Sequence, residues 1–266
     1  MTRRIASPAR GAAAAVLLIL LPGTAAAQAL ADRVARAPDG EVRFSFAARE
    51  GICGNGENSI RDVQRGSSYG YHRSGDESWE YDCEYGPVRI ALTKDGERIT
   101  RLRAYVGGRW RGTPATDLGT VSAPEAARWL VATARRADGK VGERAVFAST
   151  IADSVEAWPE LLRLARDEGV PRGTRRSAVF WVGQAAGDAA TAGLDSLVDD
   201  ADADLEVREQ AVFALSQRPR DEGVPVLIRL ARTSPSPSIR KKALFWLGQS
   251  EDPRALALFE EILTRP

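Results

Sequence analysis

Few residues of this chain have the chemistry of an active site, and they lie in its N-terminal half. The sequence has a single histidine, His72, and two cysteines, Cys53 and Cys83. A histidine can act as a general base or a metal ligand near neutral pH. No G-x-S-x-G nucleophile motif accompanies this one. We therefore interpret His72 as a surface or hydrogen-bonded residue, and we expect no catalytic residue, no metal site and no cofactor.

The two cysteines fit one disulfide better than a metal or redox site. They lie 30 residues apart, without a C-x-x-C spacing or a nearby pair of histidines. An isolated pair in an exported chain is typical of a single disulfide in an oxidising compartment. Closing a loop of this length would stabilise the fold by about 3–4 kcal/mol on the chain-entropy model. We predict a bond between Cys53 and Cys83.

An acidic stretch surrounds the second cysteine. The carboxylates of Glu80, Asp82 and Glu84 alternate with the side chains of Trp79, Tyr81, Cys83 and Tyr85. On a strand, this alternation places the carboxylates on one face and the aromatic rings on the other. We interpret the carboxylates as a solvated face over an aromatic core. The alternative is a weak calcium site or a site for a basic partner.

The N-terminus has the features of a secretory signal peptide over residues 1–27. A positive segment ending at Arg10 precedes an apolar run over residues 11–21, which is too short to span a bilayer comfortably. Small residues follow, so we predict cleavage near Ala27 or Ala29. The product would be a periplasmic or secreted protein without membrane insertion. The alternative is an uncleaved anchor.

Alternating side chains predict a small β-rich domain before the helical part. Apolar and polar residues alternate over residues 41–47, 88–92 and 102–106. Asp95-Gly96 lies between the last two runs, which is a strong hairpin signal. We assign residues 28–121 to this domain and its linker, with residues 28–40 as a loose leader and residues 112–119 as the linker.

The C-terminal half repeats itself about every 33 residues. Four similar segments begin at Ala145, Ala178, Ala211 and Ala243, with spacings of 33, 33 and 32 residues. A fixed period of this size indicates stacked repeats, each of which buries its apolar face against its neighbours. The predicted first helices of the pairs cover about 123–136, 156–168, 190–199, 223–232 and 253–264. The predicted second helices cover about 141–152, 173–186, 205–217 and 238–249.

The second helices resemble those of a known repeat family. Residues 205–215 and 238–248 are similar to the second helix of HEAT repeats, and more closely to the short HEAT-like repeats named after phycobilisome lyases. The arginine of that motif stands at Arg175, Arg208 and Arg240, whereas the first unit has Gly142. The resemblance implies a HEAT-like α-solenoid of about four and a half helix pairs over residues 122–266. The expected fold class is therefore α+β, mainly α.

The phase of the second helices indicates a repeated aromatic surface. In the helix near residues 205–217, Val207, Ala211 and Leu215 share the buried stripe, and Phe213 points more than about 100° away from its middle. The equivalent positions form a row of phenylalanines (Phe147, Phe180, Phe213 and Phe245) beside a row of glutamines (Gln184, Gln217 and Gln249). In HEAT-like arrays the second helices line the concave surface, so the resemblance implies a contact surface for a partner. The alternative is that these phenylalanines pack between adjacent second helices.

Composition and architecture together favour a binding protein. The net charge of +1 argues against a nucleic-acid binder. We expect a scaffold that contacts another protein through its solenoid and has no enzymatic activity. Two alternatives remain open. The N-terminal domain could be a hydrolase or a ligand-binding module around His72, supported by the solenoid, or the β domain could cover the concave face in a purely structural role.

Overall fold

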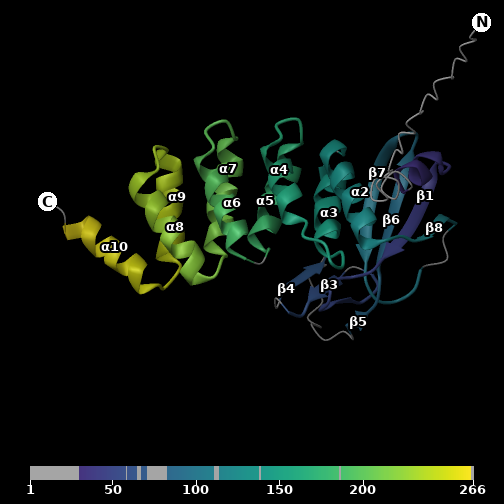
Figure 1. The fold of residues 1–266 in the computed structure, drawn as a ribbon, viewed down its shortest axis with the longest axis horizontal. Coiled ribbons are helices and arrows are strands. Elements are labelled where there is room, and N and C mark those ends of the chain that lie inside the picture. Colours follow the sequence, from purple (N-terminus) through teal and green to yellow (C-terminus); the bar gives the residue numbers. More distant parts are fainter. Residues whose placement is uncertain are drawn as a thin grey trace, which may run out of the picture.

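The computed structural model describes residues 30–57, 59–64, 67–70, 83–110, 114–137, 139–185 and 187–264. Helix pairs stack side by side through the C-terminal part, and β-strands gather at the N-terminal end of the stack (Figure 1). The predicted fold class is confirmed: the chain is α+β and mainly α, with a helical solenoid preceded by a disulfide-bearing β-rich region. The predicted signal peptide, its cleavage site near Ala27 or Ala29, and His72 all lie outside the described residues.

One four-stranded sheet lies against the first helix pair. It consists of β1 (Gly40–Phe46), β6 (Val88–Asp95), β7 (Arg98–Tyr105) and β8 (Thr116–Thr120), in the order β7-β6-β1-β8. Strand β6 pairs antiparallel with both β1 and β7, whereas β8 runs parallel to β1. Alternation places Val42, Phe44 and Phe46 on the buried face. Gly96 has φ of 58°, so the predicted hairpin turn uses the residue that adopts this conformation without strain.

The segment expected to be a loose leader is a short helix that packs into the core. Residues 30–36 are helical, and the side chains of Leu30 and Val34 are buried. The backbone N–H of Leu30 donates to Oε1 of Glu125 at 2.9 Å. The leader prediction is therefore wrong, because contacts with a residue far along the chain order this segment.

The predicted linker is also partly wrong. Residues 116–120 form strand β8 instead of a connection, and they pair with β1. The guanidinium of Arg43 on β1 forms an ion pair with Asp117 at 3.0 Å. Proline and threonine composition suggested a loop here, but an edge strand needs only a few residues once a partner strand is present.

A second, smaller sheet carries the disulfide. Its strands are β2 (Ile52–Gly54), β3 (Ser59–Asp62), β4 (Ser67–Gly70) and β5 (Glu84–Tyr85), in the order β4-β3-β2-β5. The sulfur atoms of Cys53 and Cys83 lie 2.01 Å apart, which confirms the predicted bond. Of the acidic stretch, Glu80 and Asp82 lie outside the described residues. Oε2 of the exposed Glu84 accepts a hydrogen bond from the backbone N–H of Gly108 at 2.6 Å.

The solenoid contains the predicted helices, with bounds that agree within a few residues. The first helices are α2 (Ala123–Arg136), α4 (Trp158–Arg166), α6 (Asp188–Asp199), α8 (Arg220–Thr233) and α10 (Pro253–Thr264). The second helices are α3 (Gly139–Thr150), α5 (Arg172–Gly183), α7 (Leu205–Ser216) and α9 (Pro237–Gly248). The predicted cap of α2 is present, since the Ser122 hydroxyl accepts from the backbone N–H of Glu125 at 3.4 Å.

Adjacent second helices approach one another more closely than adjacent first helices. They share more contacts along the stack, so they occupy its inner, shorter side. Two glycines permit this approach. A Cβ added to Gly142 on α3 would lie 2.4 Å from Oγ1 of Thr174 on α5, and one added to Gly183 would lie 2.8 Å from Cβ of Ala214 on α7. Gly142 occupies the position of the motif arginine in the first unit. A larger residue there would collide with Thr174.

The motif arginines join the two helices of a pair. Nε of Arg208 on α7 donates to the carbonyl oxygen of Val198 on α6 at 2.8 Å, and Nη1 of Arg240 on α9 donates to that of Ser234, the C-cap of α8, at 2.7 Å. These bonds satisfy carbonyls that a helix end leaves open. Arg175 is buried and pairs instead with Asp204 at 2.5 Å. The motif arginines are therefore structural.

Arg218 joins the second and third helix pairs to the fourth. Its guanidinium is buried and donates to the carbonyl oxygens of Gly183, Ala185 and Gly187, to the Thr191 hydroxyl and to the carboxylate of Glu222. A hydrogen bond from Thr191, followed by that from Arg218, holds the pKa of Glu222 below its usual value. Arg218 lies in the turn before α8. Its side chain thereby provides hydrogen-bond donors for the backbone carbonyl oxygens between α5 and α6.

The first prediction concerns the disulfide. Untreated protein should contain no thiol that alkylates, and the double variant Cys53→Ser/Cys83→Ser should lose about 3–4 kcal/mol of unfolding free energy. Mass spectrometry after alkylation checks the bond, and denaturant unfolding checks the energy. Ready alkylation of both cysteines without reductant would contradict the bond.

The second prediction concerns the repeat core. Ala211 is fully buried on α7, so Ala211→Arg should bury an unpaired charge and cost several kcal/mol. Ala201, in the exposed turn after α6, provides a matched control through Ala201→Arg. Thermal melting should show a large fall for the first variant and nearly none for the second. Equal melting of the two would mean that the helix phase is wrong.

The third prediction concerns Arg218. Arg218→Ala leaves three turn carbonyls and the Glu222 carboxylate without their shared donor, so we expect a loss of about 3–5 kcal/mol. The exposed Arg176 on α5 provides the control, because Arg176→Ala removes the same charge from the surface. Urea unfolding of both variants measures the difference. A loss below about 1 kcal/mol for Arg218→Ala would show that water replaces the guanidinium.

Candidate functional site

The predicted row of phenylalanines divides into two aromatic clusters. The proximal cluster contains Phe147, Phe180 and Trp181, and the distal cluster contains Phe213, Phe245 and Trp246. In the first, the ring of Trp181 lies 5.0 Å from that of Phe147 and 5.2 Å from that of Phe180. In the second, the ring of Trp246 lies 5.0 Å from Phe213 and 4.9 Å from Phe245. Each tryptophan thus bridges two consecutive second helices.

The residue after each phenylalanine decides this grouping. It is alanine on α3 and α7 (Ala148 and Ala214) and tryptophan on α5 and α9. At the alanine of α7, the backbone of α5 approaches closely, since a Cβ added to Gly183 would lie 2.8 Å from that of Ala214. The alternation of Phe-Ala with Phe-Trp is visible in the sequence, and it was the signal that could have predicted two clusters instead of one continuous row.

Exposure differs along the row. Phe147, Phe180 and Phe213 are half-buried, and each packs against a tryptophan ring. Phe245 is 55% exposed, which makes it one of the most exposed large apolar residues of the second helices. The first three side chains therefore combine packing between helices with partial access to solvent. Phe245 projects farther from the stack, with its ring supported on one side by Trp246.

The glutamine row lies at the ends of the second helices. Gln184, Gln217 and Gln249 are the C-caps of α5, α7 and α9, and their backbone N–H groups donate to carbonyls of the preceding turn. The side chains of Gln217 and Gln249 are exposed, and that of Gln184 is half-buried. The equivalent Ile151 is buried at 2% exposure. The row therefore borders the aromatic clusters at one end of the helices.

The charged groups beside the distal cluster are paired between helices. The Ser238 hydroxyl on α9 donates to the carboxylate of Glu209 on α7, and Nζ of Lys242 lies 3.4 Å from the same carboxylate. The hydrogen bond from Ser238 is the largest effect that lowers the pKa of Glu209. These contacts hold α7 and α9 in register, so the positions of Phe213 and Trp246 are fixed relative to each other.

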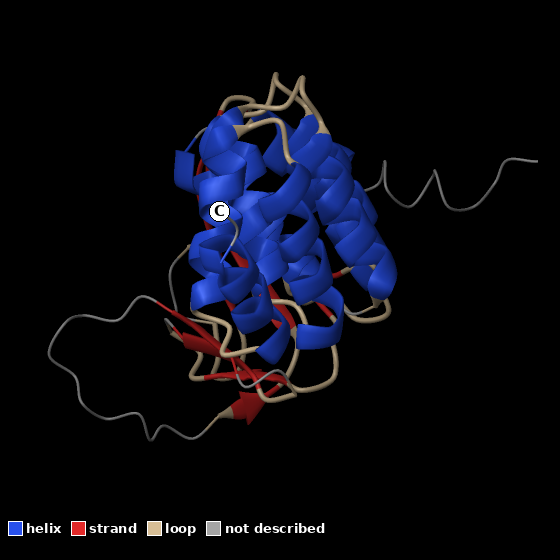
Figure 2. Ribbon diagram, turned by 90° about the vertical axis from the view of Figure 1, so that its left-hand side faces the viewer, coloured by secondary structure: helices blue, strands red, loops and turns tan. Residues whose placement is uncertain are grey.

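The β-rich region reaches the beginning of this surface. Ala48 forms an antiparallel bridge with Ala152, and the backbone N–H of Arg49 donates to the carbonyl oxygen of Ile151 at 2.9 Å. The smaller sheet lies beside the ends of the helices in Figure 2, and helices α7 and α9 lie away from the strands in Figure 1. The proximal cluster is therefore near the β region, whereas the distal cluster is remote from it.

The residues on which the alternative of an enzyme depends are mostly not among the described residues. His72 and most of the acidic stretch lie outside them. Within the described ranges, no group of three or more histidine, cysteine, aspartate or glutamate side chains could hold a metal ion. No helix in that part of the chain is both long enough and apolar enough to cross a membrane.

Comparison with known proteins identifies part of the solenoid. Residues 190–266 match the family model described as HEAT repeats. A search of curated proteins found no match. The matched residues run from α6 through α10, where the geometry shows paired helices with motif arginines at Arg208 and Arg240. The C-terminal part of the solenoid is therefore similar to HEAT repeats in both sequence and helix pairing.

Proposed function

We propose that this chain is a secreted or periplasmic scaffold that binds another protein through its second helices. HEAT repeats commonly mediate protein–protein interaction, which supports this class of function. The observation that carries the proposal is the distal cluster, where the 55% exposed ring of Phe245 stands on the inner side of the stack. Aromatic side chains of this kind supply much of the energy of protein interfaces.

The distal cluster is suited to binding because it is held in place before a partner arrives. The ring of Phe245 lies 4.9 Å from that of Trp246, in an edge-to-face arrangement with an interplanar angle of 81°. Trp246 is in turn packed against Phe213 on the neighbouring helix. A side chain fixed in this way loses little conformational entropy on binding. The buried Nε1 of Trp246 also has no acceptor among the described residues.

Polar groups surround the distal cluster as they do in protein interfaces. The exposed amides of Gln217 and Gln249 lie at the ends of α7 and α9, and Lys241 is exposed on α9. A polar rim around an aromatic centre is the usual anatomy of a binding surface. The amides can both donate and accept, which suits contact with the backbone of a partner.

Two features support export from the cytoplasm. The disulfide between Cys53 and Cys83 is the kind of bond that persists in an oxidising compartment. The N-terminal apolar run of residues 11–21 has the length and flanking residues of a signal peptide. Together they favour a periplasmic or extracellular partner.

The fourth prediction tests the binding surface. Phe245→Ser should change the unfolding free energy by no more than about 0.5 kcal/mol, because the side chain is largely exposed. Capture of a partner from native envelope, measured by crosslinking and mass spectrometry, should fall sharply because an aromatic anchor is lost. Leu205→Ser is the matched control, since Leu205 is 46% exposed at the start of α7 and outside both clusters.

Measuring both stability and partner capture for these variants separates a loss of binding from a loss of folding. Phe213→Ser, at a half-buried position, should cost more stability than Phe245→Ser, although less than the roughly 3–5 kcal/mol of a fully buried phenylalanine. If capture is the same for Phe245→Ser, Leu205→Ser and the unmodified protein, the distal cluster is not the binding surface.

A further inference from the structure

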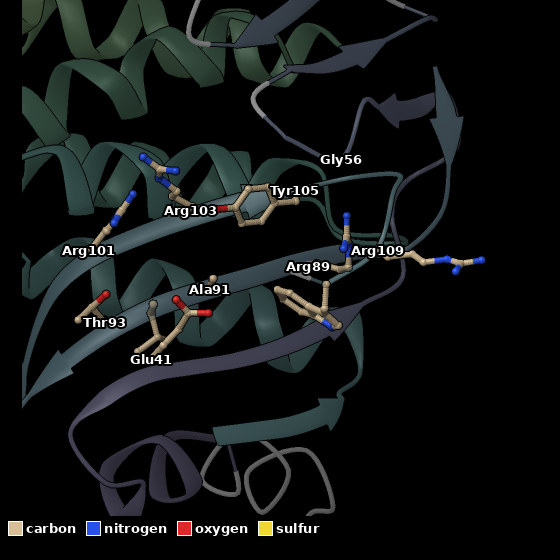
Figure 3. Close-up of a pocket in the computed structure, with 11 residues that line it drawn as sticks. Glu41, Gly56, Arg89, Ala91, Thr93, Arg101, Arg103, Tyr105 and Arg109 are labelled. Carbon is tan, nitrogen blue, oxygen red and sulfur yellow. The ribbon is translucent and has the colours of Figure 1, made fainter. Parts of the chain in front are cut away.

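The outer face of the four-stranded sheet carries a hollow of about 230 Å³, on the side away from the buried apolar residues (Figure 3). Strand register sets its composition. Arg89 lies opposite Tyr105, Ala91 opposite Arg103, and Thr93 opposite Arg101. Because alternate residues share a face, the small Ala91 and Thr93 form the floor between larger side chains. The hollow therefore results from the order of residues on β6 and β7.

A buried cation lines this hollow. Arg89 is 6% exposed, its guanidinium donates to the carbonyl oxygen of Gly107, and it lies 5.2 Å from the centre of the Trp110 ring. Within the described residues it forms no ion pair. The charge of Glu84 acts on it from farther away, but that carboxylate already accepts from Gly108. Burial lowers the pKa of Arg89, and a desolvated cation without a counterion is costly.

Two further cations on the same face form no salt bridge with the residues that the structure describes. Arg101 and Arg103 are exposed on β7, two residues apart, and neither forms a salt bridge within the described residues. Their Cα atoms are separated by about 7 Å on a strand, close enough for one ligand to contact both side chains. Among the described lining residues, the only carboxylate is that of Glu41. The face therefore has an excess of positive charge.

Some arginines of the solenoid, in contrast, pair with carboxylates of neighbouring helices. Examples are Arg166 with Asp200 at 3.4 Å and Arg229 with Asp199 at 2.9 Å. A patch of this kind favours an anionic ligand.

We propose that the hollow binds the phosphoryl group of a phosphate monoester. The planar guanidinium groups of Arg101 and Arg103 can each donate two parallel hydrogen bonds to phosphate oxygens. The buried charge of Arg89 lines the same hollow, opposite Tyr105. A phosphate monoester carries nearly two negative charges and three terminal oxygens, which matches several guanidinium groups better than a carboxylate does. The organic part of the ligand would lie against the rings of Tyr105 and Trp110.

Either a soluble phosphate ester or the headgroup of a phospholipid could supply this group. In Figure 3 the Tyr105 hydroxyl lies on the side of Arg103, so it adds a hydrogen-bonding group beside that side chain. The hollow lies on the sheet, remote from the distal cluster on α7 and α9. Binding here is therefore independent of the protein-binding surface proposed above.

The fifth prediction is tested with phenyl phosphate as the soluble probe. Titration calorimetry and tryptophan fluorescence should show saturable binding to the unmodified protein. Arg103→Gln should weaken it at least about tenfold, because a charge-assisted pair of hydrogen bonds is lost. The exposed Arg176 on α5 gives the matched control, since Arg176→Gln changes the net charge equally and should leave affinity unchanged. Arg101→Gln is the second variant if Arg103→Gln proves unstable in thermal melting.

Two comparisons identify the source and the class of the ligand. Binding of phenyl phosphate supports a soluble ester, and binding only to phosphatidic acid vesicles, with phosphatidylcholine vesicles as control, supports a lipid headgroup. Benzoate should bind more weakly than phenyl phosphate. The proposal is overturned if neither probe shows saturable binding or if benzoate binds as tightly as phenyl phosphate. It is also overturned if Arg176→Gln loses as much affinity as Arg103→Gln.

Discussion

The structure depends on covering the apolar face at the N-terminal end of the helix stack. Each repeat buries its apolar face against its neighbours, so the first pair would expose one face to water without a cover. The four-stranded sheet provides that cover. The ring of Phe44 on β1 meets that of Trp129 on α2 edge to face at 5.4 Å, and the apolar side chains of the sheet and the helices form one continuous core. The β-rich region is therefore the N-terminal cap of the solenoid as well as a unit with its own sheets.

Because one face of the four-stranded sheet packs against the helices, the residue types on its opposite face are determined as well. Because strand residues alternate, sending Val88, Ile90 and Leu92 into the core sends Arg89, Ala91 and Thr93 outward. The outward face is then free to carry charge, and there Arg89, Arg101 and Arg103 form no salt bridge with the described residues. The solenoid uses its arginines differently. There, guanidinium groups such as that of Arg218 hold adjacent repeats together, and the aromatic rings on the inner side remain partly accessible.

The sequence predicted the parts of the fold that local patterns specify. The 33-residue period and the helix phase predicted the paired helices, and Ala211 lies in the buried stripe as expected. The spacing of Cys53 and Cys83 predicted the disulfide. The leader and the linker were wrongly predicted because residues 30–36 and 116–120 owe their structure to distant partners. Leu30 bonds to a side chain 95 residues away, and Arg43 to Asp117 across 74 residues.

The candidate binding surface also depends partly on local sequence patterns and partly on tertiary contacts. The sequence by itself determined that phenylalanines recur at one position of the second helices and that glutamines follow them one turn later. Only the tertiary structure decided how closely α5 packs against α7, where a Cβ added to Gly183 would lie 2.8 Å from that of Ala214. It also decided that Phe245 stays exposed and that Arg89 is buried without an ion pair to any of the described residues. Helical and strand periods fix which residues share a face, whereas exposure and charge pairing depend on the elements that pack against that face.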